Sequence, residues 1–152
     1  MKSLSNYIQE KLIIKRNKSK NYKYFPKTKK ELQDIILQRI KEDGSEVDLN
    51  DIDVSNITDM SDLFLRKDFN GDISSWDVSN VKNMSEMFVN CFKFNKDISS
   101  WDVSNVTDMT SMFNSCKSFN QDISKWNVSK VKDHYFIFTN CAIQDKYNPK
   151  FK

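Results

Sequence analysis

Aspartates recur at one position in successive stretches of this chain of 152 residues, and they are the residues best suited to chemistry. The members of this column are Asp48, Asp72, Asp97 and Asp122. Stacked like charges repel, so each carboxylate must be solvated, hydrogen-bonded to an amide, or neutralised by a cation or a basic partner. We favour a carboxylate that caps a turn in the neighbouring unit. Calcium-binding repeats use glycine-rich ligand loops, and this chain has two glycines.

Cysteine and tryptophan form two further columns. They are Cys91, Cys116 and Cys141, and Trp76, Trp101 and Trp126. Cysteines 25 residues apart do not have the paired spacing of a zinc site, and an odd number favours reduced thiols over disulfides. Tryptophans in phase with apolar residues favour core packing over a stacking platform for bases or sugars. His134 takes the place of a core methionine, and no Cys-His or Ser-His-Asp arrangement suits a nucleophilic site. We therefore expect no enzyme, metal or cofactor.

A period of 25 residues positions all these side chains. The sequence repeats that begin at Phe69, Phe94 and Phe119 are near copies of one another. A degenerate repeat, offset by 24 residues, precedes them from Asp48. Such a period is typical of a solenoid, because one unit cannot bury its apolar face alone. Apolar spacing over 105–116 predicts a short helix in each unit, and 122–124 predicts a short strand. The expected fold class is therefore an α/β repeat, a short leucine-rich-repeat-type solenoid with an N-terminal helical cap.

Four segments follow from these patterns. Residues 1–25 form a basic arm with a short amphipathic helix, 26–48 a helical cap, 49–141 about four repeat units, and 142–152 a C-terminal cap. In the helical cap, Thr28 and Glu31 have the spacing of a capping box, and Gly44 is placed to end the helix. This helix would cover the apolar layer that the first unit otherwise exposes to water.

Positive charge is concentrated at the start of the chain. The net charge is +3, but residues 1–30 hold ten Lys or Arg and one acidic residue. The candidate nucleic-acid contacts in this arm are Lys15, Arg16, Lys18, Lys20 and Lys23. The cationic side chains in this arm could contact a phosphate backbone while its aromatic rings stack on bases. A solvated connector is the commoner explanation of such a segment. We see no apolar run long enough to span a membrane and no signal core, so we expect a cytoplasmic protein.

The repeat unit resembles the BspA-like family of leucine-rich repeats over residues 49–141. In that family Met-Phe-x-x-Cys and then Phe-Asn-x-Asp-Ile-Ser-x-Trp-Asp-Val-Ser-Asn-Val recur in 25-residue steps in bacterial surface proteins and lipoproteins. The resemblance implies surface display, adhesion and protein binding, whereas this chain has no visible signal or lipid anchor. The stretch from Tyr7 to Lys15 also looks like the start of proteins from large bacterial viruses.

The expected function is non-enzymatic binding of a protein partner through the sheet face of the repeats. Between units the framework is constant, while Gly71/Lys96/Gln121 and Ser75/Ser100/Lys125 vary, and varying outward positions carry specificity in repeat arrays. The candidate contacts are Asp72, Asp97, Asp122, Lys96, Gln121, Ser75, Ser100 and Lys125. The alternative is a nucleic-acid-associated or host-factor-inhibiting protein that acts through the basic arm, and the oligomeric state stays open.

Overall fold

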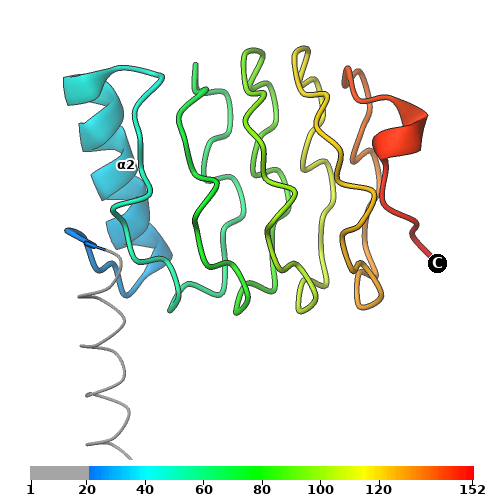
Figure 1. The fold of residues 1–152 in the computed structure, drawn as a ribbon, viewed down its shortest axis with the longest axis horizontal. Coiled ribbons are helices and arrows are strands. Elements are labelled where there is room, and N and C mark those ends of the chain that lie inside the picture. The colour runs from blue at the N-terminus through cyan, green and yellow to red at the C-terminus, as the bar shows by residue number, and fades with distance from the viewer. Residues whose placement is uncertain (1–20) are drawn as a thin grey trace, which may run out of the picture.

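The structure is a computed structural model that describes residues 21–152. Its two regular elements are the helix α2 (Lys29–Asp43) and the 3-10 helix η1 (Asp145–Tyr147). Figure 1 shows α2 at one end, η1 near the other end, and between them coils of chain that lie side by side. The coils are called coil 1 (48–69), coil 2 (72–94), coil 3 (97–119) and coil 4 (122–141). None of the described helices is long and apolar enough to cross a membrane.

Helix α2 has the boundaries that its capping residues dictate. The Glu31 N–H donates to Thr28 Oγ1 at 3.2 Å, and the Glu31 carboxylate accepts from the Lys27 N–H at 2.8 Å. At the other end Gly44 has a φ of 89°, and its N–H donates to Ile40 O at 3.0 Å. A positive φ is readily available to glycine, which explains why the helix ends here. The predicted helix is therefore confirmed.

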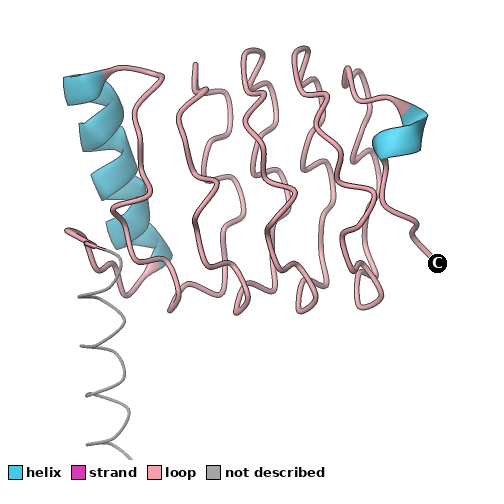
Figure 2. Ribbon diagram, in the orientation of Figure 1, coloured by secondary structure: helices cyan, strands magenta, loops and turns pink. Residues whose placement is uncertain are grey.

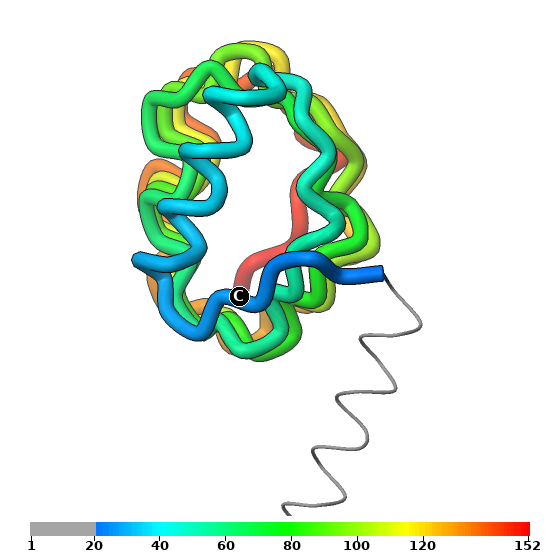
Figure 3. The backbone as a smooth tube through the Cα atoms, turned by 90° about the vertical axis from the view of Figure 1, so that its left-hand side faces the viewer, coloured from blue at the N-terminus to red at the C-terminus, as the bar shows by residue number. Residues whose placement is uncertain are grey.

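Helix α2 packs against coil 1 through both apolar and polar side chains. Leu32 and Ile36 are fully buried. Lys29 Nζ donates to Ser61 Oγ at 2.7 Å and to Asp62 Oδ2 at 3.1 Å, and Gln33 Nε2 donates to Asp62 Oδ1 at 3.0 Å. Seen along the stack, α2 lies across the end of the superimposed coils (Figure 3). The helix thus keeps water from the apolar interior of coil 1.

The prediction of an α/β leucine-rich-repeat solenoid is wrong. Among residues 21–152 no strand forms (Figure 2), and the β-type pairing between coils is limited to isolated parallel bridges such as Asn83 to Asp108. The expected helix over 105–116 is a series of turns, in which Ser111 and Ser115 have φ values of 55° and 61°. A right-handed helix has negative φ throughout, so these residues exclude one. The expected strand over 122–124 does not form either, since these residues are irregular and lead into a turn at Ser124.

Backbone hydrogen bonds between coils replace the expected sheet. Four N–H groups of coil 2 donate to four carbonyl groups of coil 3 at 2.8 to 3.0 Å. The pairs are Met84 to Asp108, Glu86 to Thr110, Phe88 to Met112, and Asn90 to Asn114. Coil 1 donates to coil 2, and coil 3 to coil 4, in the same register. Each coil therefore relies on the next one to satisfy its amides.

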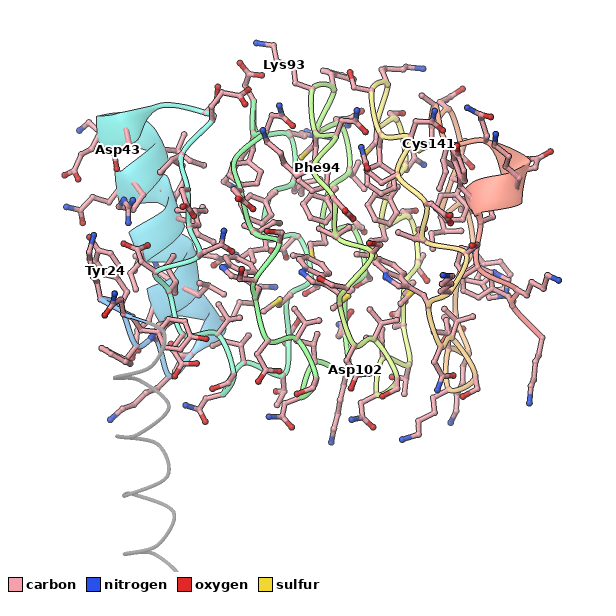
Figure 4. All side chains as sticks on the ribbon, viewed as in Figure 1. Tyr24, Asp43, Lys93, Phe94, Asp102 and Cys141 are labelled. Carbon is pink, nitrogen blue, oxygen red and sulfur yellow. The ribbon has the colours of Figure 1, made fainter. Side chains whose placement is uncertain are left out.

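Columns of aromatic rings fill the space inside the coils. Phe88 stacks on Phe64 and on Phe113 with ring centroids 5.4 and 5.5 Å apart. Phe94 lies 4.2 Å from Phe88 in the same coil and 5.8 Å from Phe119 in the next. These rings are fully buried, and Figure 4 shows Phe94 within the stack. Because each ring contacts neighbours above and below, no coil has a complete core of its own.

We predict that Phe94→Ala lowers the free energy of unfolding by roughly 3 to 5 kcal/mol, because it removes a fully buried ring and leaves a cavity. Phe92→Ala is the matched control, since Phe92 is 54% exposed two residues away, and it should change stability by less than about 0.5 kcal/mol. Urea unfolding followed by tryptophan fluorescence measures both. Equal losses for the two variants would contradict the assignment of Phe94 to the core.

Candidate binding surface

The aspartates singled out in the sequence lie at one corner of the coils, where each caps a turn. The Ser74 N–H donates to Asp72 Oδ1 at 2.9 Å, and the Ser99 N–H donates to Asp97 Oδ1 at 2.9 Å. Asp122 accepts from the Ser124 N–H at 3.0 Å. Each carboxylate therefore caps a turn in its own coil, and not in the neighbouring coil as we expected.

Hydrogen bonds keep these carboxylates ionised. The bonds from Ser99 lower the pKa of Asp97, and those from Ser124 lower the pKa of Asp122. For Asp72, burial raises the pKa, but the hydrogen bonds from Ser74 and Asn50 and the charge of Lys96 together outweigh burial, so the net shift is downward. A hydrogen bond to a carboxylate stabilises the charged form. The corner is consequently a column of negative charge at neutral pH.

A second column of carboxylates runs beside the first. Asp77 and Asp102 follow the tryptophans and accept from the Ser79 and Ser104 N–H groups at 3.2 and 3.0 Å. Hydrogen bonds to Ser104 lower the pKa of Asp102, and repulsion from Asp77 opposes that shift. The two carboxylates are thus close enough to repel each other. Sequence reasoning missed this column because it treated it as constant framework, although the exchange of Asp for Asn127 in coil 4 marks the position as outward.

The second column lines a polar surface hollow of about 390 Å³ between coil 2 and coil 3. Its lining residues are Ser74, Ser75, Trp76, Asp77, Val78, Ser100 and Asp102. Two of the predicted contacts, Ser75 and Ser100, are therefore brought together here. Figure 4 shows Asp102 at the lower edge of the coils. The hollow offers serine hydroxyls, backbone groups and two carboxylates, which is a set of acceptors suited to a cationic or amide-bearing group.

The other predicted contacts lie outside the hollow. Lys96 Nζ is 3.5 Å from Glu46 Oε2, and Gln121 Nε2 donates to Asn95 O at 3.0 Å. Lys125 is exposed, and its charge acts on Asp122. Lys96 and Gln121 hold the same repeat position in successive units, and Lys125 holds the position of Ser75 and Ser100 in coil 4. None of the three lines the hollow.

Only one of the five predicted nucleic-acid contacts lies in the described part of the chain. Lys23 has a side chain that is 72% exposed, and its Nζ lies 3.4 Å from Asp51 Oδ2. The other four candidates lie outside the described residues, as does the short amphipathic helix expected before them. They are Lys15, Arg16, Lys18 and Lys20.

Cys91 and Cys116 are core residues whose thiols donate hydrogen bonds to backbone carbonyl groups. Cys91 Sγ donates to Phe64 O at 2.8 Å, and Cys116 Sγ donates to Phe88 O at 3.0 Å. Burial raises the pKa of Cys91 to about 12 and also raises that of Cys116. A nucleophilic cysteine needs a lowered pKa, so these thiols are unsuited to that role. Within residues 21–152, no group of three or more His, Cys, Asp or Glu side chains is placed to hold a metal ion.

We predict that the free energy of unfolding falls as the pH drops below about 4. The folded state lowers the pKa of Asp72, Asp97, Asp102 and Asp122 below the unfolded value near 3.9. A lowered folded pKa contributes stability above the unfolded pKa, and that contribution is lost as the pH falls through the folded pKa. Urea titrations at pH 7, 5, 4 and 3 measure the trend. Stability that stays constant down to pH 3 would contradict it.

We further predict that Asp102→Ala destabilises the protein by about 1 kcal/mol, because the Ser104 N–H loses its acceptor. Asp102→Asn is the matched control and should be nearly neutral. The chain itself uses Asn at this position in coil 4, where Asn127 Oδ1 accepts from the Ser129 N–H at 3.2 Å. Thermal and urea unfolding of both variants tests the pair. If Asn destabilises as much as Ala, the charge rather than the turn is what matters.

The comparison with protein families gives one match. Residues 32–150 match the family described as "Mycoplasma protein of unknown function, DUF285". The match begins inside helix α2 and extends over coils 1 to 4 and most of the tail. No curated protein and no solved structure matches the chain. Since the matched region covers well over half of the sequence, the chain belongs to this family of Mycoplasma proteins.

Proposed function

We propose that this protein is a non-enzymatic binding module that takes a protein partner on the acidic corner of its coils. The proposal rests above all on the polar hollow between coils 2 and 3, which joins two outward serines to two carboxylates. The sheet face on which we first expected the partner does not exist in the described residues, and this corner takes its place. We also propose that the repeat is of the BspA-like sequence type, which agrees with a binding role.

The chemistry of the corner favours a partner segment with lysine or arginine. The Asp102 carboxylate accepts hydrogen bonds from Ser104 and keeps capacity for more, since a carboxylate has about four acceptor sites. Repulsion between Asp77 and Asp102 is relieved when a cation lies between them. A guanidinium group suits this hollow because its planar donors can bond two oxygens at once.

Variation between coils supports specificity at the same surface. Ser75 and Ser100 become Lys125 in coil 4, while the tryptophan that follows each of them stays constant and buried. A partner that spans several coils would therefore meet a different side chain at each step of an otherwise uniform column. This pattern is typical of repeat proteins that bind other proteins.

The alternative remains a protein that binds nucleic acid, or inhibits a host factor, through Lys15, Arg16, Lys18, Lys20 and Lys23. Nucleic-acid binding of this kind would weaken steeply with salt. On the basis of the sequence, we also propose that the protein is cytoplasmic, is of bacterial or viral origin and has no enzymatic activity.

Ser100→Arg tests the proposed surface directly, because it puts a bulky cation into the hollow. We predict that affinity purification with this variant from Mycoplasma lysate recovers at least one specific protein about tenfold less than wild type does. Ser118→Arg is the matched control, since it adds the same group at an exposed position outside the hollow. Quantitative mass spectrometry compares the three samples, with and without nuclease.

Identical protein sets for wild type and Ser100→Arg would contradict the proposed surface. Recovery that disappears with nuclease for every variant would support the basic arm instead. Circular dichroism and urea unfolding of Ser100→Arg establish beforehand that the variant keeps the fold.

A further inference from the structure

Along one side of the stack, four backbone N–H groups in each of coils 1 to 3 donate to carbonyl groups of the next coil. The reverse direction is used beside this row by Lys82, Thr107 and Lys132, whose N–H groups donate to the preceding coil. From Met60 to Arg66 in coil 1, every second N–H donates to a carbonyl of coil 2. The same pattern leads from coil 2 to coil 3 and from coil 3 to coil 4. On this side each coil therefore presents donors to its successor and acceptors to its predecessor. The stack has a donor end and an acceptor end, as a helix does.

Coil 4 lies at the donor end, and its amides have no successor among residues 21–152. The N–H groups equivalent to the donors of the other coils belong to His134, Phe136, Phe138 and Asn140. No described residue accepts from them. The backbone of coil 4 nevertheless has the same conformation as that of coil 3, whose N–H groups donate to coil 4. Phe136 and Asn140 have φ values of 58° and 54°, close to those of Ser111 and Ser115. These four N–H groups are called the amide row.

The side chains beside the amide row differ from those in other coils. Tyr135 and Phe136 are 70% and 68% exposed. Coil 2 has Ser85 and Glu86 at these places, and coil 3 has Thr110 and Ser111. Two large exposed rings next to N–H groups without a described acceptor are typical of an interaction surface, because a partner that covers the rings removes their apolar area from water.

The tail already supplies a carbonyl to another part of coil 4. The Ile123 N–H donates to Tyr147 O at 3.2 Å, at the end of η1. Further along, Phe151 stacks on His134 with ring centroids 4.3 Å apart. Figure 1 shows this tail crossing the outer side of the last coil. The described tail therefore covers part of coil 4 and gives no acceptor to the amide row.

A second copy of this chain does not fit the amide row. Tail-to-tail contact would set donors against donors, which leaves both rows without acceptors. Head-to-tail contact would need the acceptor edge of coil 1, but α2 occupies that end through Lys29 and Gln33, which bond to Ser61 and Asp62. Neither residues 21–152 nor a second copy supplies acceptors to the amide row, so we look to a different polypeptide for them.

We propose that the amide row binds a segment of a partner protein, which adds to coil 4 as a further coil through its backbone carbonyl groups. The rings of Tyr135 and Phe136 pack on the apolar side chains of that segment. The mode resembles strand addition at a sheet edge, in which backbone bonds give affinity and side chains give selectivity. This site is at the donor end of the stack and is separate from the acidic corner.

A peptide copied from the chain itself tests the proposal on full-length protein. The probe has the sequence of residues 106–115, whose carbonyls accept from coil 2 in the same register. We expect it to slow hydrogen exchange at the Phe136, Phe138 and Asn140 amides at least about tenfold in ¹⁵N NMR spectra. Without the peptide these amides should exchange much faster than that of Phe113, which is bonded to coil 4.

Two controls make the test specific. A scrambled peptide of the same composition should give no protection. The variant Tyr135→Thr/Phe136→Ser, which installs the residues found in coil 3, should keep the fold and weaken peptide binding about tenfold. The proposal is overturned if the amide row is as protected as Phe113 without peptide, or if the probe gives no protection at 1 mM. It is also overturned if the scrambled peptide protects as well as the probe, or if the variant binds the probe as tightly as wild type.

Discussion

The row of backbone hydrogen bonds from each coil to the next is the constraint on which the rest of the structure depends. A coil made of turns cannot satisfy its own amides as a helix does, so four N–H groups in each coil must find carbonyls in the next. The aromatic columns obey the same requirement, because each ring contacts rings in the coils before and after it. A coil is therefore stable only between neighbours, and the ends of the stack need separate solutions.

The side chains that recur every 25 residues serve this contact between coils. Trp76 Nε1 donates to Leu49 O at 2.9 Å, and Trp101 Nε1 donates to Ile73 O at 3.2 Å. The thiols bond to carbonyls of the preceding coil, and Asn70 Oδ1 accepts from the Asn95 N–H at 2.9 Å. A buried carbonyl without a donor is costly, which explains why these positions hold one residue type. Repetition in this chain thus indicates structure, and function has to be sought at the exposed positions beside it.

The sequence predicted the period, the buried columns and helix α2, because each depends on local spacing and on capping residues such as Thr28 and Gly44. The secondary structure predicted for each unit, one strand and one short helix, was wrong. Apolar residues at 106, 109, 112, 113 and 116 have helical spacing, but successive turns bury the same positions. The short polar residues decide between the two, since Asp108 Oδ1 accepts from the Thr110 N–H at 2.8 Å and favours a turn over a helix.

The candidate surface could be predicted only in part for a related reason. Ser75 and Ser100 were found because they vary in the fourth coil, but Asp77 and Asp102 were set aside as constant framework. A residue that caps a turn can also be outward, because the turn uses one carboxylate oxygen and leaves acceptor capacity toward solvent. Turn capping and partner binding are therefore not alternatives for these aspartates, and spacing alone does not separate them.

The direction of the hydrogen bonds also explains the unlike ends of the stack. Coil 1 presents carbonyls and carboxylates outward, and α2 meets them with donors: Lys29 and Gln33 reach Asp62, and Arg39 Nη2 donates to Asp48 O at 3.1 Å. The hydrogen bonds that Arg39 donates to Asp43 and Asp51 raise the pKa of Arg39 and hold its charge at this end. A helix satisfies its own backbone, so it can cover an edge only through side chains, and lysine, glutamine and arginine are donors. Such a cap suits an edge of acceptors. The donor edge of coil 4 needs acceptors instead, and a backbone with outward carbonyl groups is the most direct source of them.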